Sequence, residues 1–265
     1  MNTKHAIKPS FKFTSVRELI EWAAEYHGDK TAFSYRLSSR DKEVQKVSFV
    51  QMANDIRALA SRLLELGCAG KHCALIGKLS YEWVLTYYAV LSIGGVLVPL
   101  DRDWLKEDLA DTGKKSDAEY LFGDEDIAEK IEYIAEYTSL SAEPVYLLSH
   151  EKTNTLSNLT EEGRILFEEA PALYYSVSVN PLNMALLVFT SGTTGKGKGV
   201  MLNQNAILSD MYNAVHYLDY GDKTIDRLVY INDTLYTISK DYFLFTKLNT
   251  RLTTNTFLFI IKSRI

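Results

Sequence analysis

The sequence predicts an α/β fold in which a mainly parallel β-sheet is flanked by helices. Three observations support this prediction. Between residues 72 and 148, short apolar segments typical of buried strands alternate with segments of helical periodicity. The connections between them are short, as in βαβ units. Farther along, the apolar run 184–189 leads directly into a loop rich in glycine, threonine and lysine. Because ligands of such sheets bind at the carboxyl ends of the strands, this loop marks the expected site.

The expected elements follow from hydrophobic period and from helix start and stop signals. The first half of the chain is expected to contain helix 15–26, strands 31–37 and 42–47, a helix from the cap Ser48 to Gly67, strand 72–77, helix 80–93 and strand 95–100. Next come a helix capped by Asp103 and ending near Lys114, strand 118–122, helix 124–137, strand 144–148, a polar loop 149–158 and helix 159–169. A last helix is expected from Asn203 or Asn205 through Leu218.

Composition narrows the class of protein. A chain of 265 residues that is 46% hydrophobic can bury a substantial core, and a net charge of −5 argues against a general nucleic-acid binder. The first ten residues lack the apolar region of a secretory signal, and no apolar run reaches the length of a membrane span. We therefore expect a cytoplasmic protein without a transmembrane segment, while peripheral membrane contact stays open. The two cysteines, Cys68 and Cys73, fit no zinc motif, so no metal ligands are predicted.

The most informative segment is Thr190-Ser-Gly-Thr-Thr-Gly-Lys-Gly-Lys-Gly-Val200. Its glycines let the backbone approach a ligand closely, and successive backbone N–H groups can form an anion-binding concavity. Hydroxyl and ammonium groups add donors for a polyphosphate. The predicted phosphate-binding residues are Thr190, Ser191, Gly192, Thr193, Thr194, Gly195, Lys196 and Lys198.

A P-loop is the competing interpretation of this segment. Residues 192–198 fit G-x-x-x-x-G-K, but Gly199 stands where the Ser or Thr that holds Mg²⁺ should be. Gly199-Val-Met-Leu202 also has the character of a strand, whereas a P-loop opens a helix. We therefore expect the loop to connect two strands of a hairpin.

The same segment resembles the signature loop T-S-G-T-T-G-x-P-K-G-V of the adenylate-forming superfamily, with Gly197 in place of the usual proline. That superfamily contains acyl-CoA synthetases, nonribosomal-peptide adenylation domains and luciferases. Upstream, Val47-Ser-Phe-Val-Gln-Met52 is similar to the family's T-Y-x-E-L helix entry, and residues 91–101 are similar to K-A-G-x-x-x-V-P-L/I-D. The resemblance runs from about Phe13 to about Asp226. It implies the N-terminal domain of the adenylate-forming fold, in incomplete form.

The resemblance also implies an activity. A relative most like a long-chain fatty acid–CoA ligase would use ATP and Mg²⁺ to convert a carboxylate to acyl-AMP and would then transfer the acyl group to coenzyme A. The expected substrate is a small-molecule carboxylate, in particular a fatty acid, and not a nucleic acid. Family members place further catalytic groups downstream, in a Y-G-x-T-E segment and a mobile C-terminal domain. No catalytic residue is therefore assignable within this chain, and the chain alone is expected to be inactive.

The last 39 residues, 227–265, contain no Gly, Ala, Pro or Glu. The family's L-P-L-H-H strand does not appear after Asp226. We therefore expect residues 1–226 to form a partial AMP-binding domain and residues 227–265 to be an aberrant tail produced by a frameshift near Arg227, or a divergent terminal segment. Two other functions stay open: a non-catalytic fragment or pseudogene product with residual nucleotide binding, and, third, a P-loop-like NTPase.

Overall fold

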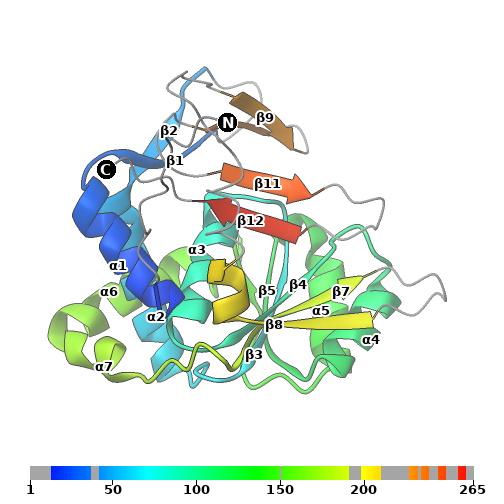
Figure 1. Cartoon of the computed structure of the whole chain (residues 1–265). Helices are drawn as coiled ribbons and strands as arrows, with labels where there is room; N and C mark the ends of the chain where they lie inside the picture. Colours follow the sequence, from blue (N-terminus) through cyan, green and yellow to red (C-terminus); the bar gives the residue numbers. More distant parts are fainter. Residues whose placement is uncertain are drawn as a thin grey trace, which may run out of the picture.

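The computed structural model describes residues 13–36, 42–149, 151–190 and 198–209, together with four strands in the last 39 residues. A six-stranded sheet with the order β6-β5-β3-β4-β7-β8 forms its centre (Figure 1). Its strands are β3 (His72–Ile76), β4 (Val96–Leu100), β5 (Ala118–Gly123), β6 (Val145–Tyr146), β7 (Met184–Thr190) and β8 (Lys198–Asn203). The first five are mutually parallel, and β8 is antiparallel to β7. The predicted α/β fold with a mainly parallel sheet is confirmed.

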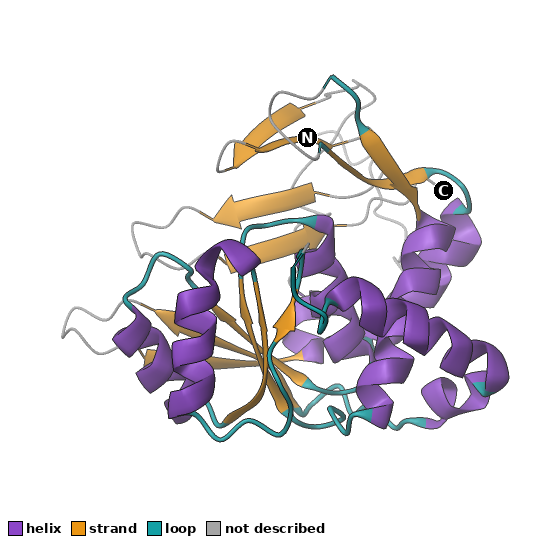
Figure 2. Cartoon of the chain, turned by 180° about the vertical axis from the view of Figure 1, so that it is seen from behind, coloured by secondary structure: helices purple, strands orange, loops and turns teal. Residues whose placement is uncertain are grey.

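Helices cover both faces of this sheet (Figure 2). Successive residues of one strand point to opposite faces. Cys73 and Leu75 of β3 thus belong to one core, while Ala74 and Ile76 belong to the other. The first core is covered by α1 (Val16–His27), α2 (Phe49–Glu65), α3 (Tyr81–Ser92), α6 (Leu156–Glu169) and α7 (Pro171–Ser176). The second core is covered by α4 (Lys106–Lys115) and α5 (Ala128–Tyr137), which follows the short 3₁₀ helix η1 (Glu125–Ile127).

Hydroxyl side chains begin four of these helices. Ser15, Ser48, Ser80 and Thr155 each accept a hydrogen bond from the backbone N–H three residues later, at 3.1–3.2 Å. Each bond satisfies one of the amides that a helix start leaves unpaired. The predicted cap at Ser48 is confirmed. Ser48 also pairs with Thr31 where the hairpin of β1 (Thr31–Tyr35) and β2 (Gln45–Ser48) meets α2.

Two predicted helix starts are wrong. Asp103 caps no helix, because α4 begins at Lys106 after Leu105, without a side-chain cap. The backbone N–H of Asp103 instead donates to the Asp101 carboxylate at 3.0 Å, in a turn that precedes the helix. Helix α6 begins at Leu156 rather than at residue 159, because Thr155, inside the expected polar loop, caps it.

A buried glutamine fastens the amino-terminal helix to the sheet domain. Gln204 is 1% exposed and follows β8 in a helical segment, residues 204–209. Its Oε1 accepts from the backbone N–H of Val16 at 2.8 Å, and its Nε2 donates to the carbonyl of Leu91 at 2.7 Å. The side-chain amide of Gln204 thus satisfies a backbone N–H at the start of α1 and a backbone carbonyl near the end of α3. Because both partners are distant from Gln204 in sequence, no local sequence pattern predicts these contacts.

The last 39 residues contribute two antiparallel hairpins, β9 (Arg227–Ile231) with β10 (Thr234–Ile238) and β11 (Leu244–Leu248) with β12 (Thr256–Ile260). Among the described strands, neither hairpin pairs with the six-stranded sheet. The proposed domain boundary at residue 226 stays a prediction.

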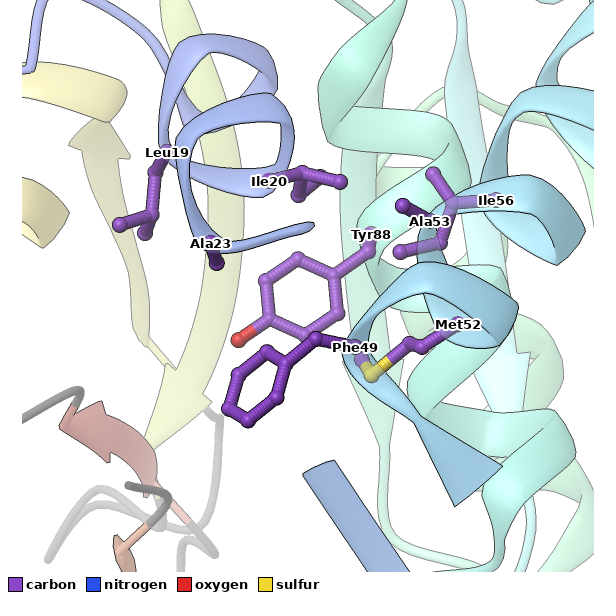
Figure 3. A pocket seen from close by; sticks show the side chains of 8 residues that line it. All are labelled: Leu19, Ile20, Ala23, Phe49, Met52, Ala53, Ile56 and Tyr88. Atoms are coloured by element: carbon purple, nitrogen blue, oxygen red, sulfur yellow. The ribbon is translucent and has the colours of Figure 1, made fainter. Parts of the chain in front are cut away.

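The first core contains a small cavity between α1, α2 and α3 (Figure 3). Its volume is about 20 Å³, and its lining is apolar except for the Tyr88 hydroxyl. A space of this size holds about one water molecule, and a water there would find too few polar partners to be stable. The cavity is therefore a packing defect and is too small for a ligand.

The approach of α6 to α2 depends on one glycine. A Cβ atom added at Gly163 would lie 1.9 Å from the carbonyl oxygen of Ala58, far inside any permitted contact. Ion pairs flank this crossing, with Arg62 to Glu162 at 2.8 Å and Arg164 to Asp55 at 3.0 Å. Surface ion pairs of this kind contribute little, so the backbone fit at Gly163 sets the distance between the helices.

We predict that Gly163→Ala destabilises the chain by about 1–3 kcal/mol, the range observed for overpacked cores. Alanine favours a helix by up to about 1 kcal/mol over glycine, but the clash with Ala58 outweighs this gain. Gly113→Ala in α4 is the matched control, because its Cβ would meet the Thr138 methyl at 3.4 Å and Ile134 Cγ2 at 3.7 Å, both ordinary van der Waals contacts. Urea unfolding measures both variants. Equal stability of Gly163→Ala and the wild-type chain would contradict the close crossing.

Candidate functional site: the carboxyl edge of the sheet

The predicted phosphate-binding loop is the connection of a hairpin between β7 and β8. The two strands lie side by side in Figure 1, with Thr190 opposite Lys198 in antiparallel register. Thr190 ends β7, a strand buried between the two cores, and Lys198 begins β8 with an exposed side chain. The other predicted ligands, Ser191, Gly192, Thr193, Thr194, Gly195 and Lys196, lie outside the described residues. The structure therefore places the two ends of the loop at the carboxyl edge of the parallel strands.

The geometry after the loop differs from that of a P-loop. A P-loop delivers its phosphate directly to the first turn of a helix. Here residues 198–203 form strand β8, as expected from their sequence. The helical segment 204–209 begins only after Asn203, whose Oδ1 accepts from the N–H of Ala206 at 2.8 Å. The predicted helix start is confirmed, and its extension from residue 210 to Leu218 lies outside the described residues.

Charged residues gather at the same edge, immediately after β3, β4 and β5. Arg102 donates from Nη1 to Asp124 Oδ2 at 2.6 Å and from Nη2 to Asp126 Oδ2 at 2.9 Å. Lys78 adds its backbone N–H to Asp124 at 2.6 Å and its Nζ to Asp126 at 2.7 Å. Two cations thus neutralise two carboxylates in one cluster. Sequence analysis missed it, although each member is a charged residue placed just beyond a buried apolar strand.

The two carboxylates of this cluster differ in environment. Burial raises the pKa of Asp124, against the hydrogen bond from Lys78 and the attraction of Arg102. Partial burial favours a higher pKa for Asp126 as well. Hydrogen bonds from Arg102 and Lys78 outweigh this effect, so the pKa of Asp126 is lowered. Gly77 is needed beside them, because a Cβ there would lie 2.8 Å from Asp124 Oδ1. The cluster is therefore closely packed as well as paired.

Glu82 lies near the same edge, in the first turn of α3. Burial raises its pKa, the hydrogen bond from Ser80 opposes the rise, and repulsion by Asp124 adds to it. A raised pKa near a candidate site is consistent with function but is also common in structural networks. Here the folded chain binds a proton at Glu82 more tightly than the unfolded chain does.

This raised pKa gives a pH-dependent prediction for Glu82→Gln. An unfolded glutamate has a pKa of about 4.3, which lies below the raised pKa of Glu82 in the folded chain. As the pH rises above about 4.3, the unfolded chain loses this proton first, and the free energy of unfolding therefore falls. At pH 7 the ionised Glu82 thus lowers the stability of the folded chain. Glutamine carries no charge at any pH. The variant should therefore melt above the wild-type chain at pH 7, and the difference should shrink toward pH 4. Glu168→Gln, at an exposed position of α6, is the control. A pH-independent difference would contradict the assignment.

Metal ligands are not grouped in the part of the chain that the structure describes. No three His, Cys, Asp or Glu side chains there are arranged to hold an ion. Cys68 and Cys73 are buried and free of disulfide bonds. None of the described helices combines the length and apolar character needed to cross a membrane.

A hollow of about 250 Å³ lies at the opposite, amino edge of the sheet. Its walls include the turns at Gly70 and Gly94 and the start of β7 at Met184. No charged side chain lines it among the described residues, so it has none of the cations that a polyphosphate requires. The hollow therefore does not compete with the carboxyl edge as the predicted phosphate site.

The chain belongs to the AMP-binding enzyme family, because the family profile of that description matches residues 20–246. The long-chain-fatty-acid–CoA ligases FadD15 of Mycobacterium bovis and Mycobacterium tuberculosis are similar, each 29% identical over 174 residues. That alignment covers 64% of this chain and 28% of each relative. A crotonobetaine/carnitine–CoA ligase from Citrobacter koseri is 25% identical over 71% of this chain and 36% of its own.

Solved structures show the same fold. A long-chain-fatty-acid–CoA ligase, FadD1, from Archaeoglobus fulgidus superposes with a TM-score of 0.67 at 24% identity, over 80% of this chain and 42% of its own. ATP-bound MatB from Rhodopseudomonas palustris gives a TM-score of 0.60 at 19% identity, over 78% of this chain and 38% of its own. The predicted resemblance to adenylate-forming enzymes is confirmed. The chain spans well under half the length of these relatives.

Proposed function

We propose that the β7–β8 loop binds the phosphates of ATP, and that the chain is part of an enzyme that adenylates a carboxylic acid. One observation supports this most strongly. A loop of glycines, hydroxyls and lysines is the tip of a hairpin at the carboxyl edge of a parallel sheet, in a chain of the AMP-binding family. Thr190 and Lys198 lie at its two ends and are paired in the hairpin.

In the proposed reaction, a carboxylate oxygen attacks the α-phosphorus of ATP. The bond from the α-phosphorus to the bridging oxygen breaks, and pyrophosphate leaves with that oxygen and its electron pair. The loop amides and Lys198 would hold the charge of the leaving phosphates, which is an electrostatic contribution to rate. The thiolate of coenzyme A would then displace AMP from the acyl adenylate.

Mg²⁺ would neutralise phosphate charge during the first step. No three His, Cys, Asp or Glu side chains of the described residues are grouped to hold it, so we assign no ligand to it in this chain. The phosphate-binding groups that we propose in this chain are therefore the donors of the loop, Lys198 included.

A long-chain fatty acid is the proposed substrate. The names of the FadD15 and FadD1 relatives support this class, and a carboxylic acid is the shared requirement of the named ligases. The 20 Å³ cavity of the first core is far too small for an acyl chain. We therefore place the proposed acyl pocket outside the space between α1, α2 and α3.

A second candidate is nucleotide binding without acyl transfer by these 265 residues alone. The short alignment favours this candidate, since it covers only 28% of the length of FadD15. ATP–pyrophosphate exchange in the presence of a fatty acid distinguishes the two. Exchange shows reversible adenylation, whereas ATP binding without exchange supports the second candidate. A chain that does not bind ATP excludes both.

The loop assignment is tested by Lys198→Ala. Removal of one charge-assisted hydrogen bond to phosphate should weaken ATP binding by about 1.5–3 kcal/mol, which is roughly 10-fold to 150-fold in Kd. Gly195→Val should weaken it further if the backbone passes close to phosphate. Isothermal titration calorimetry measures both. Lys115→Ala, at an exposed position of α4, is the control for charge alone. Unchanged ATP affinity in Lys198→Ala and Gly195→Val would contradict the assignment.

A further inference from the structure

Strand β8 is the terminal strand of the six-stranded sheet, next to β7 (Figure 1). Among the described strands it pairs with β7 alone, so the backbone groups along its other side have no strand partner there. Native proteins usually protect such an edge with charges, proline or a covering segment, because it can template pairing with another chain. The six residues Lys198–Asn203 contain no proline, and their only charge stands at the first position. The sequence of β8 therefore permits the addition of a further strand.

The side chains of β8 are exposed on both faces of the sheet. Val200 is 43% exposed and shares a face with Leu202, which packs against the first core. Met201 is 71% exposed and shares the opposite face with Gly199, beside Leu187 of the second core. The helical layers that bury β7 on both sides thus leave two apolar side chains of β8 exposed, one on each face.

A second copy of the chain fits this edge. When two identical strands pair antiparallel about a two-fold axis, opposite residues share a face, so their numbers differ by zero or by an even number. With Val200 at the centre, this residue faces its own copy. Lys198 then faces Leu202, and Gly199 faces Met201. The Met201 side chain would lie beside Gly199 of the second copy, which has no side chain to obstruct it, and no like charges come opposite each other.

We propose that two copies of the chain associate by antiparallel pairing of their β8 strands, centred on Val200, so that two six-stranded sheets become continuous. The pairing needs no nucleotide and is therefore independent of the proposed function. A single strand pair buries less area than the interfaces of stable complexes, which bury about 1,200–2,000 Å². We therefore expect a weak dimer, with a Kd of roughly 10–100 μM.

Analytical ultracentrifugation of the whole 265-residue chain, over a concentration series that brackets this Kd, tests the proposal. Val200→Lys sets two ammonium groups opposite each other and should raise the Kd about threefold to thirtyfold, and Val200→Glu should act likewise. An equimolar mixture of these two variants should restore association, because opposite charges then face each other. Met201→Lys should weaken the dimer less, since it faces glycine. Ile165→Lys is the matched control, because Ile165 is 60% exposed on α6.

A chain that stays monomeric throughout the series would overturn the proposal, whether water or another segment of the same chain covers the edge. Association that Val200→Lys leaves unchanged, that Ile165→Lys weakens equally or that the mixture does not restore would also overturn it. Growth beyond the dimer would contradict a closed two-fold pair, which leaves no free β8 edge. Hydrogen exchange of the wild-type chain is a readout that needs no variant: exchange of β8 amides should slow as concentration rises, and unchanged exchange would overturn the proposal.

Discussion

Burial of the parallel strands on both faces is the constraint on which the rest of this structure depends. Cys73 and Leu75 enter one core while Ala74 and Ile76 enter the other. The strand β4 alternates in the same way, and β7 does so from Leu186 to Phe189. Such strands have no polar face, so their polar partners and ligands can only be placed at their ends. Lys78, Arg102 and Asp124 accordingly lie just past the ends of three buried strands. The same constraint explains why the proposed phosphate-binding loop follows Thr190, at the end of β7.

Features with local causes could be predicted from the sequence. The Ser48 cap is a hydroxyl placed before an amphipathic run, and the bond to the N–H of Gln51 needs only residues of the same turn. The hairpin of β7 and β8 followed from two apolar runs around a glycine-rich loop. The strand order β6-β5-β3-β4-β7-β8 could not be predicted from the sequence, because long-range contacts determine which strands pair.

The wrong helix start at Asp103 and the missed contacts had a common physical origin, whereas the wrong start of α6 overlooked a local cap at Thr155. Asp103 has the residue type of a helix cap, but its N–H is used by Asp101, and the turn carbonyls are used by Lys130, 26 residues from Trp104. The Arg102–Asp124 pair spans 22 residues and the Gln204–Leu91 bond spans 113. No local pattern contains these partners. Sequence reasoning therefore predicted the hairpin from local patterns but missed these long-range contacts at the same edge of the sheet.

The departure from the family signature at Gly197 connects these observations. Proline at this position would fix φ and reduce the conformational freedom of the unbound loop, an effect of about 0.4–1 kcal/mol at compatible sites. Glycine gives up that advantage, because it leaves the backbone the widest range of conformations. The ends of the neighbouring strands are ordered differently, by side-chain contacts distant in sequence: Lys130 donates to two carbonyls of the Asp101–Trp104 turn at 2.8 Å, and Arg102 bridges two aspartates.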